Sequence, residues 1–283
     1  MGDELMSLSI GKKEYLEKMC KQCRIDIIET LHNIQTGHPG GSLSAVEIII
    51  TLYFEKMNIR PEQPKWQNRD RFILGKGHAA PALYWALAEK GYFPKEDFKS
   101  LRQLGCHLQG HPCANTTKGV ELSTGPLGLG LSAGIGMALA SKLDNIGNYT
   151  YVLIGDGETQ EGIIWEAAMS ASKFKVDNLI VILDNNGVQL DGTLAEIMPM
   201  GDMAAKWRAF GWQVINADGH NVESISDAID EAKTIKGLPT IIIAKTVKGK
   251  GVSFMEGKNI WHGKPIDDEH YEIAMKELRG ICR

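Results

Sequence analysis

Two polar side chains stand at the ends of apolar runs, where they could share a metal ion and phosphate oxygens. Asp156 follows the run 151–154 within Gly155-Asp156-Gly157, and Asn186 closes a second run, 179–183. One strand, one helix and a second parallel strand would bring both ends to the same edge of a sheet. Carboxylate and amide oxygens that converge there suit a hard cation such as Mg²⁺. The spacing therefore predicts a ligand site outside the carboxyl ends of two strands.

The two glycines of this motif have a physical task. Gly155 and Gly157 carry no Cβ, so they permit a tight turn and let a bulky anionic group approach the backbone. An isolated Gly-Asp-Gly is more often only a turn, because Gly and Asp are common turn residues. The second strand end at a suitable distance favours a site over a turn.

The alternation of apolar runs and helical patterns predicts an α/β fold with a doubly wound, mostly parallel sheet of about five strands. Strands are expected at 71–74, 149–154, 179–184, 212–215 and 240–244, and helices between them at 131–143, 162–174, 203–210 and 222–235. The first 57 residues predict two helices, the second beginning at a capping box of Ser44 and Glu47. The long irregular segment 106–128 is typical of a functional loop.

Composition excludes several classes of function. The 283 residues, 43% of them apolar, can bury a large core. A net charge of -4 with scattered Lys and Arg provides no basic stripe for a nucleic acid. No apolar run approaches the roughly 18 residues needed to span a bilayer, and the N-terminus 1–4 is acidic where a secretory signal is basic. We expect a cytoplasmic protein that binds neither nucleic acid nor membrane.

The five cysteines form an odd set, which argues against a disulfide framework and for a reducing compartment. Cys20 and Cys23 fall within a helical apolar pattern, where core packing is favoured over the alternatives of zinc binding and redox chemistry.

Two glycine-rich segments admit other interpretations. The segment 128–134 comes within one residue of the dinucleotide fingerprint, which would indicate a nicotinamide-dependent oxidoreductase, but a poor strand precedes it. Gly75-Lys76-Gly77 lacks the spacing and the hydroxyl residue of a phosphate-binding P-loop.

Four histidines share one kind of context. His38, His78, His111 and His262 each adjoin glycine or proline in a predicted loop, which would hold their rings at a cleft. His32, His107 and His270 indicate surface or packing positions, and His220 is intermediate.

The order of these motifs carries a family resemblance: the chain is similar to the N-terminal, diphosphate-binding half of transketolase over nearly its whole length. Gly155-Asp156-Gly157 followed by Asn185-Asn186 resembles the thiamine-diphosphate motif of that superfamily. The accompanying motifs are Gly37-His38-Pro39-Gly40, Gly75-Lys76-Gly77-His78, Gly110-His111-Pro112, Thr124-Gly125-Pro126-Leu127-Gly128, Asp218-Gly219-His220 and His262-Gly263-Lys264-Pro265.

The resemblance implies specific roles in binding the cofactor. Asp156, Asn186 and the backbone carbonyl of Val188 would hold Mg²⁺, with Ca²⁺ or Mn²⁺ as substitutes, and the metal would bridge the diphosphate of thiamine diphosphate. The residues implied to approach the diphosphate are His78, Gly157 and His262, and Gly155 and Asn186 are also implied to bind the cofactor. Those implied to lie near the aminopyrimidine are Gly125, Pro126 and Leu127.

The resemblance also implies catalytic and interface residues. His38, His111 and His262 would line the substrate channel, hydrogen-bond the sugar and move protons. Glu161 matches an acid at the subunit interface, although a first-turn acid favoured by the helix dipole explains it equally well.

The main departure from the family is length. Residues 1–283 are expected to form a single diphosphate-binding domain, and the chain ends without the pyrimidine-binding domain. The resemblance therefore implies the N-terminal subunit of a split transketolase that needs a separate C-terminal subunit, in an α₂β₂ assembly. Such an enzyme transfers a two-carbon ketol unit from a ketose phosphate to an aldose phosphate, as in the pentose phosphate pathway.

Two alternatives stay open. One is another thiamine-diphosphate enzyme, such as a 2-oxoacid dehydrogenase alpha subunit or a deoxyxylulose-phosphate synthase. The other is a non-catalytic module that binds a partner protein.

Overall fold

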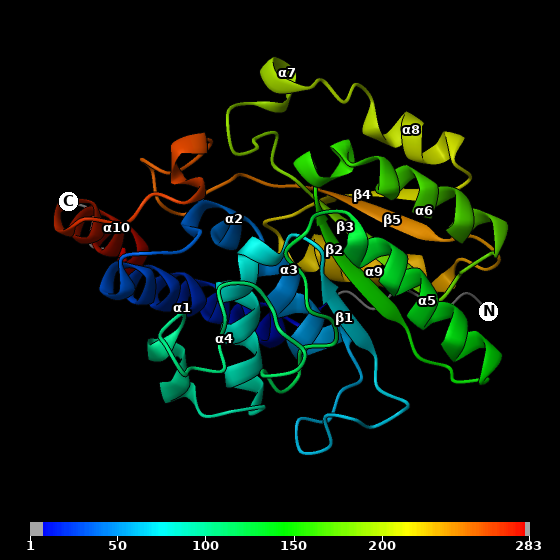
Figure 1. Cartoon of the computed structure of the whole chain (residues 1–283), viewed down its shortest axis with the longest axis horizontal. Helices are drawn as coiled ribbons and strands as arrows, with labels where there is room; N and C mark the ends of the chain where they lie inside the picture. The colour runs from blue at the N-terminus through cyan, green and yellow to red at the C-terminus, as the bar shows by residue number, and fades with distance from the viewer. Residues whose placement is uncertain (1–7, 281–283) are drawn as a thin grey trace.

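A five-stranded parallel sheet forms the centre of the molecule (Figure 1). The structure is a computed structural model that describes residues 8–280. The strand order is β1-β2-β3-β5-β4, and every neighbouring pair is parallel. The strands are β1 (Arg71–Leu74), β2 (Thr150–Gly155), β3 (Leu179–Asn185), β4 (Gln213–Asp218) and β5 (Thr240–Lys245). The predicted α/β sheet of about five parallel strands is confirmed.

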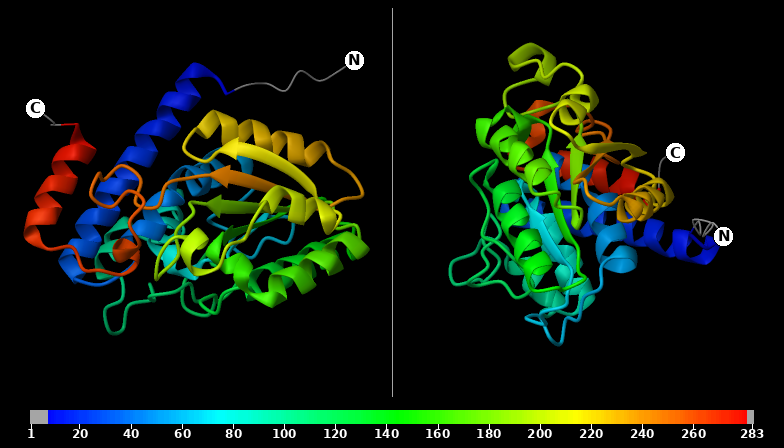
Figure 2. Two further views of the ribbon diagram at one scale, coloured as in Figure 1. Left: turned by 90° about the horizontal axis from the view of Figure 1, so that it is seen from above. Right: turned by 90° about the vertical axis from the view of Figure 1, so that its right-hand side faces the viewer.

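Helices cover both faces of the sheet, so that two separate cores form (Figure 2). Successive strand residues point to opposite faces: Tyr151 and Ile180 belong to one core, and Val152 and Val181 to the other. A sheet buried on both faces explains why β2 and β3 are almost continuously apolar. The first core lies against α1 (Ile10–Ile34), α3 (Val46–Thr51), α4 (Ala80–Lys90), α9 (Val222–Thr234) and α10 (Asp268–Arg279). The second lies against α5 (Leu129–Leu143), α6 (Gly162–Lys173) and α8 (Met203–Ala209).

The crossing of the chain between faces opens a crevice at the carboxyl ends of the strands. After β1 the chain enters α4 on the first face, whereas after β2 it enters α6 on the opposite face. The short elements near this edge are α2 (Pro39–Ser44), η2 (Gly77–Ala79), η4 (Gly157–Gln160), α7 (Leu194–Ile197) and η5 (Asn259–His262). The remaining short elements are η1 (Leu52–Lys56) and η3 (Lys95–Ser100).

The predicted capping box of the second helix is wrong, although a helix, α3, does begin near the predicted position, at Val46. The helix α2 already begins at Pro39, with His38 as its N-cap residue, and Ser44 ends it. Proline suits the first turn of a helix because its missing N–H would have no partner there. Ser44 and Glu47 form no capping box, because each side chain bonds to a distant segment: Ser44 to Asp184, and Glu47 to Arg24.

The helix α5 approaches the sheet closely through glycine. A Cβ on Gly134 would lie 2.5 Å from Cγ2 of Val152, whereas a Cβ on Gly136 of the same helix would meet no atom within 4 Å. Small residues on one face of α5 therefore determine how near it can lie to β2.

Alanine at these two positions should change stability in opposite directions. Gly134→Ala is expected to lower the free energy of unfolding by about 1–3 kcal/mol, because the added methyl group overpacks the core. Gly136→Ala is expected to raise it by about 0.5–1 kcal/mol, because alanine favours the helix and the site is open. Urea unfolding of both variants checks this, and equal effects at the two positions would contradict the packing of α5.

Candidate active site

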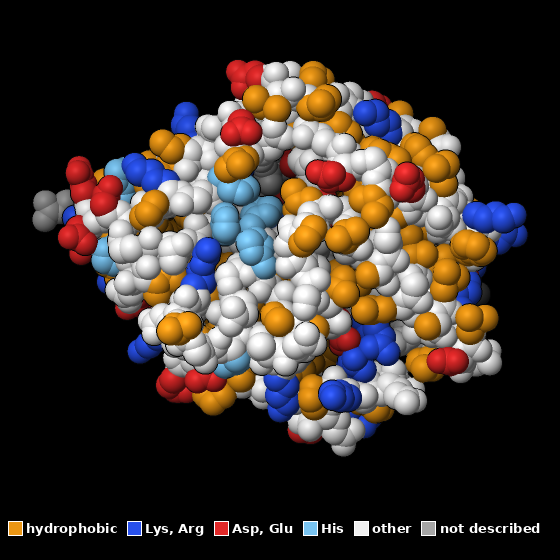
Figure 3. Space-filling view, viewed as in Figure 1, with side chains coloured by type: hydrophobic (Ala, Val, Ile, Leu, Met, Phe, Trp, Pro, Cys, Tyr) orange, Lys and Arg blue, Asp and Glu red, His pale blue; other side chains and the backbone are white. Residues whose placement is uncertain are grey.

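A pocket of about 370 Å³ opens at the carboxyl ends of β1, β2 and β3. In the space-filling view, histidine side chains gather beside a hollow on this face of the molecule (Figure 3). Most residues proposed from sequence line this one pocket: His38, His78, His111, Gly125, Leu127, Gly155, Asp156, Gly157, Glu161, Val188 and His262. Pro126 and Asn186 do not; Pro126 is exposed, and Asn186 is half-buried just after β3, where its side-chain N–H donates to Asp184 at 3.3 Å.

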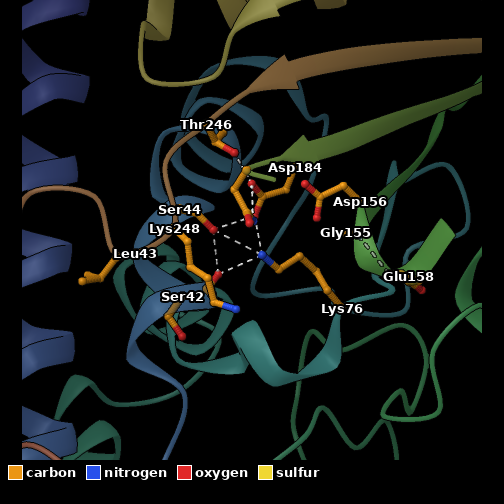
Figure 4. A network of polar contacts seen from close by, with 12 residues as sticks. Ser42, Leu43, Ser44, Lys76, Gly155, Asp156, Glu158, Asp184, Thr246 and Lys248 are labelled. Atoms are coloured by element: carbon orange, nitrogen blue, oxygen red, sulfur yellow. Dashed lines mark hydrogen bonds and ion pairs between the residues drawn. The ribbon is translucent and has the colours of Figure 1, made fainter. Parts of the chain in front are cut away.

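A buried ion pair joins the ends of two strands beneath the pocket. Lys76, just after β1, contacts the carboxylate of Asp184 near the end of β3, and their side chains are 2% and 0% exposed. Ser44 donates to the same carboxylate at 2.6 Å, and Thr246, after β5, donates to its other oxygen. Figure 4 shows the lysine and both hydroxyls directed at Asp184. Buried charges need such pairing and hydrogen bonding, so this network fixes the relative positions of three strand ends and α2.

Asp156 is buried beside Asp184 but has no cationic side chain bonded to it among the described residues. Its carboxylate, 1% exposed, accepts hydrogen bonds from the backbone N–H groups of Gly157 (2.8 Å) and Gly187 (2.5 Å). Burial, followed by the charge of Asp184, raises the pKa of Asp156 to about 6. A carboxylate held rigidly in this way, and destabilised as an anion, is complemented by a cation.

The neighbouring oxygens fit a hard metal ion. The side-chain oxygen of Asn186 accepts from the N–H of Val188 at 3.0 Å, and the carbonyl of Val188 accepts from Nζ of Lys248 at 3.3 Å. One carboxylate, one amide and one carbonyl are oxygen donors of the kind that Mg²⁺ or Ca²⁺ prefers. Among residues 8–280 no group of three His, Cys, Asp or Glu side chains is arranged to hold a metal ion.

The backbone N–H of Gly155 does not face the pocket as an open donor. It donates to one carboxylate oxygen of Glu158 at 3.1 Å, and Gly128 donates to the other at 2.9 Å. Burial raises the pKa of Glu158 to about 7. This buried acid therefore ties the turn after β2 to the start of α5, a role that sequence reasoning missed.

The four loop histidines meet in one cluster. Ring centroids of His38 lie 5.7 Å from His78, 5.8 Å from His111 and 5.3 Å from His262, and those of His78 and His262 are 4.8 Å apart. The four rings come from segments spread over most of the chain: the N-cap of α2, η2, the 101–128 loop and η5. The glycine- and proline-rich context of these histidines predicted that each ring lies at a cleft. It could not predict that the four rings meet.

The rings are neutral at physiological pH. Burial, with the charge of Arg102 next, lowers the pKa of His38 to about 4, and burial, with Lys248 next, lowers that of His262 to about 3. The pKa of His78 is lowered by burial and Lys76, and that of His111 by burial and Arg102. A neutral imidazole offers one acceptor and one donor nitrogen, so each ring of the cluster can both accept and donate a hydrogen bond.

Hydrogen bonding assigns the tautomer of His262. Nζ of Lys248 lies 3.1 Å from Nδ1 of His262, and because an ammonium group only donates, Nδ1 is the acceptor. The proton of this ring therefore resides on Nε2. Burial, with Lys76 next, lowers the pKa of Lys248 to about 8, so most of this amine is still protonated at pH 7.

Buried networks outside the pocket hold these side chains in place. The hydroxyl of Tyr84 donates to the backbone carbonyl of His111 at 3.1 Å. Nε2 of His220 accepts from the N–H of Val247, the neighbour of Lys248, at 2.8 Å, and its Nδ1 lies 2.9 Å from Glu47. His220 thus anchors the loop that carries Lys248.

Sequence reasoning missed Lys76, Glu158 and Lys248 as pocket residues. The two lysines sit in glycine-rich segments directly after β1 and β5, and that position at a strand end was the available signal. Glu158 follows the Gly-Asp-Gly motif by one residue, but only the tertiary structure shows that it is buried. Glu161 is exposed at the rim of the pocket and is the N-cap residue of α6, so its position at the helix N-terminus stays compatible with the dipole interpretation.

Comparison with known proteins decides the family. Residues 16–281 match the family described as "Transketolase, thiamine diphosphate binding domain". This chain belongs to the transketolase family. The alternative interpretation of segment 128–134 as the dinucleotide fingerprint of a nicotinamide-dependent oxidoreductase is therefore wrong. That segment is instead the start of α5.

Two relatives in this family match the chain over almost their full length. The protein named 6-deoxy-6-sulfo-D-fructose transketolase subunit from Clostridium sp. (strain MSTE9) is 47% identical over 251 residues, which are 89% of this chain and 91% of that protein. One of the named subunits of apulose-4-phosphate transketolase, from Phocaeicola vulgatus, is 42% identical over 94% of each chain.

Solved transketolases share the fold but are longer. The transketolase structure from Campylobacter jejuni superposes with a TM-score of 0.89 at 34% identity, covering 96% of this chain and 43% of that one. The chain therefore spans about two fifths of the solved transketolases. No helix in the range 8–280 has the length and apolar character to cross a membrane.

The neutral histidine cluster should make stability depend on pH. The pKa of folded His38, about 4, lies below its ordinary value of 6.5, so the unfolded state binds the proton more tightly. Stability is therefore full above pH 6.5 and falls as the pH is lowered toward 4.

Urea unfolding at pH 7 and pH 5 measures this effect. His38→Gln should lose less stability than the unsubstituted chain over this interval, by about 1 kcal/mol. His270→Gln, outside the cluster, controls for the loss of a ring. An unchanged pH dependence in His38→Gln would show that this ring is not held neutral by the fold.

Proposed function

We propose that this chain is the N-terminal, thiamine-diphosphate-binding subunit of a two-subunit transketolase. The assembly transfers a two-carbon ketol unit from a ketose phosphate to an aldose phosphate. The observation that carries the proposal is the cluster of four neutral histidines beside a lysine-lined pocket at the ends of β1, β2 and β3. Thiamine diphosphate needs a part of the site that binds its anionic diphosphate. The sugar needs neutral side chains nearby that can hydrogen-bond its oxygens and move protons.

The lysine-lined end is proposed to hold the diphosphate and its metal ion. Asp156, Asn186 and the carbonyl of Val188 would bind Mg²⁺, or Ca²⁺ or Mn²⁺ in its place. Lys248, whose Nζ bonds to backbone carbonyls and His262, adds positive charge nearby, which favours a diphosphate. The residues proposed to contact the diphosphate are His78, Gly157 and His262, with Gly155 and Asn186 also proposed to bind the cofactor, and those along the aminopyrimidine are Gly125, Pro126 and Leu127.

The histidine end is proposed to handle the sugar. When bound, thiamine diphosphate supplies the carbanion chemistry that breaks and forms the carbon–carbon bond. His38, His111 and His262 are neutral, so each can hydrogen-bond a hydroxyl or carbonyl oxygen and move a proton to or from it at pH 7. The Nε2–H of His262 can donate a hydrogen bond to the sugar. The unprotonated ring nitrogen of a neighbouring histidine can accept one.

A separate chain is proposed to supply the pyrimidine-binding domain. The support is that this chain matches relatives named as transketolase subunits over more than nine tenths of their length, but only about two fifths of the solved transketolases. Residues 1–283 would then form one domain, and two copies with two partner chains an α₂β₂ assembly. Glu161, exposed at the pocket rim, is proposed to lie at the subunit interface.

We place this assembly in the cytoplasm. The described cysteines, Cys20, Cys23, Cys106 and Cys113, are all free, as a reducing compartment favours, whereas Cys282 and the acidic N-terminus lie outside the described residues. Cys20 and Cys23 are buried in the first core, which supports packing over zinc or redox chemistry.

Replacement of Asp156 tests the metal assignment. Asp156→Ala should weaken Mg²⁺-dependent binding of thiamine diphosphate by about 3 kcal/mol or more, because the cation and diphosphate lose a buried counter-charge. Isothermal titration calorimetry on the chain with its partner measures it. Asp144→Ala, which removes an exposed carboxylate at the end of α5, serves as the control. Equal cofactor affinity in both variants would refute the assignment.

Reconstitution tests the activity. The chain mixed with a pyrimidine-domain subunit should transfer a ketol unit from a ketose phosphate, and neither chain should do so alone. Pyruvate as the donor distinguishes the other thiamine enzymes, since turnover of pyruvate but not of ketose would favour a 2-oxoacid dehydrogenase or a deoxyxylulose-phosphate synthase. A stable complex without turnover of either donor would favour a non-catalytic module.

A further inference from the structure

An arginine lies beside the histidine cluster on a strained and closed loop. Arg102 has a φ of 62°, a left-handed conformation that non-glycine residues rarely adopt. Its backbone N–H donates to the carbonyl of Leu108 at 2.9 Å, which closes the loop. Strain of this kind persists where the surrounding structure holds a side chain in a particular place.

The guanidinium group of Arg102 packs on a glycine next to His111. A Cβ on Gly110 would lie 3.1 Å from both Cζ and Nε of Arg102, and 3.2 Å from Nη2. The absence of a side chain at Gly110 thus lets the planar guanidinium lie flat against the backbone just before His111.

The positive charge of Arg102 lies on the His111 side of the cluster, against Gly110, whereas Lys248 contacts His262. Arg102 lowers the pKa of His38 and of His111, and Lys248 lowers that of His38 as well as those of His78 and His262. The histidine cluster therefore has Arg102 beside His111 and Lys248 beside His262. The lysine end is already assigned to the diphosphate, which leaves the charge of Arg102 without a role.

This guanidinium has no partner within the described part of the chain. No hydrogen bond or ion pair engages it in the range 8–280, whereas Arg24, Arg69 and Arg71 each pair with a glutamate. Its side chain is exposed. A guanidinium held in place, but left unpaired beside a pocket, is suited to bind an oxyanion through its forked donors.

We propose that Arg102, seated on Gly110, binds the phosphate group of the sugar substrate at the outer end of the histidine pocket. This subsite rests on the proposed ketol transfer. It assigns part of phosphate recognition to this chain, in addition to any groups that the partner supplies. The sugar would then extend past His38 and His111 with its phosphate on Arg102 and its reacting end toward His262.

Steady-state kinetics on the reconstituted pair, with thiamine diphosphate and Mg²⁺, test the subsite. The donors are a ketose phosphate and the same ketose without its phosphate. Arg102→Gln should raise KM for the phosphorylated donor about 10- to 100-fold, the range expected for one lost charge-assisted interaction. It should leave kcat, and KM for the unphosphorylated donor, within about twofold, a split that a merely structural role would not produce.

A second test variant, Gly110→Ala, accompanies Arg102→Gln, and each of the two has a matched control. Arg208→Gln removes another exposed arginine, on α8, and should leave both KM values unchanged. Gly110→Ala keeps the charge but displaces the guanidinium, so it should raise KM for the phosphorylated donor alone, by less than Arg102→Gln. Gly147→Ala, where a Cβ meets no atom within 4 Å, is its control. A rise in KM for both donors alike, or for neither, in Arg102→Gln would overturn the subsite.

A direct binding measurement separates this inference from the proposed function. If the pair turns over neither ketose, the ketol-transfer proposal fails, and inorganic phosphate is then titrated into the pair saturated with thiamine diphosphate and Mg²⁺. Weaker phosphate binding by Arg102→Gln than by Arg208→Gln would support the subsite. Equal binding by the two variants, or no binding by the unsubstituted pair, would refute it.

Discussion

The buried ion pair between Lys76 and Asp184 is the interaction on which the rest of the site depends. It joins the ends of β1 and β3, and through the hydroxyls of Ser44 and Thr246 it also holds α2 and the segment after β5. Removing two charges from water is costly, and their attraction offsets that cost only when the geometry is closely satisfied. These strand ends are therefore held in one relative arrangement, and the segments that carry His78, Val188 and Lys248 into the pocket start from them.

The electrostatics of the pocket follow from this arrangement. Asp184 has its charge compensated by Lys76, whereas Asp156, alongside it, has only backbone donors and is complemented by an added cation. Burial, with the positive charges of Arg102 and Lys248, keeps the pKa of His38 and of His262 well below neutrality. These rings are therefore neutral at pH 7, where each offers one hydrogen-bond donor and one acceptor.

Local patterns predicted the scaffold more reliably than the site. The apolar runs that became β2 and β3 are buried on both faces, so their position and adjacency followed from periodicity and connection length. The capping box at Ser44 failed because a serine and a glutamate at that spacing can equally bond to distant segments, as they do here. Lys76 was set aside with an unmatched glycine motif, since a pattern scan cannot show that a lysine will be buried against a carboxylate.

The sequence by itself determined that Asp156 and Asn186 follow neighbouring parallel strands, because strand periodicity and a single helical crossover leave few other topologies. The histidine contexts and the order of the motifs identified the family. Only the tertiary structure decided that Lys76 meets Asp184, 108 positions away, that four histidines from separate loops share one cluster, and that Arg102 lies against Gly110. Such pairings depend on how helices pack on both faces of the sheet, and the packing between distant segments leaves no local periodicity to detect.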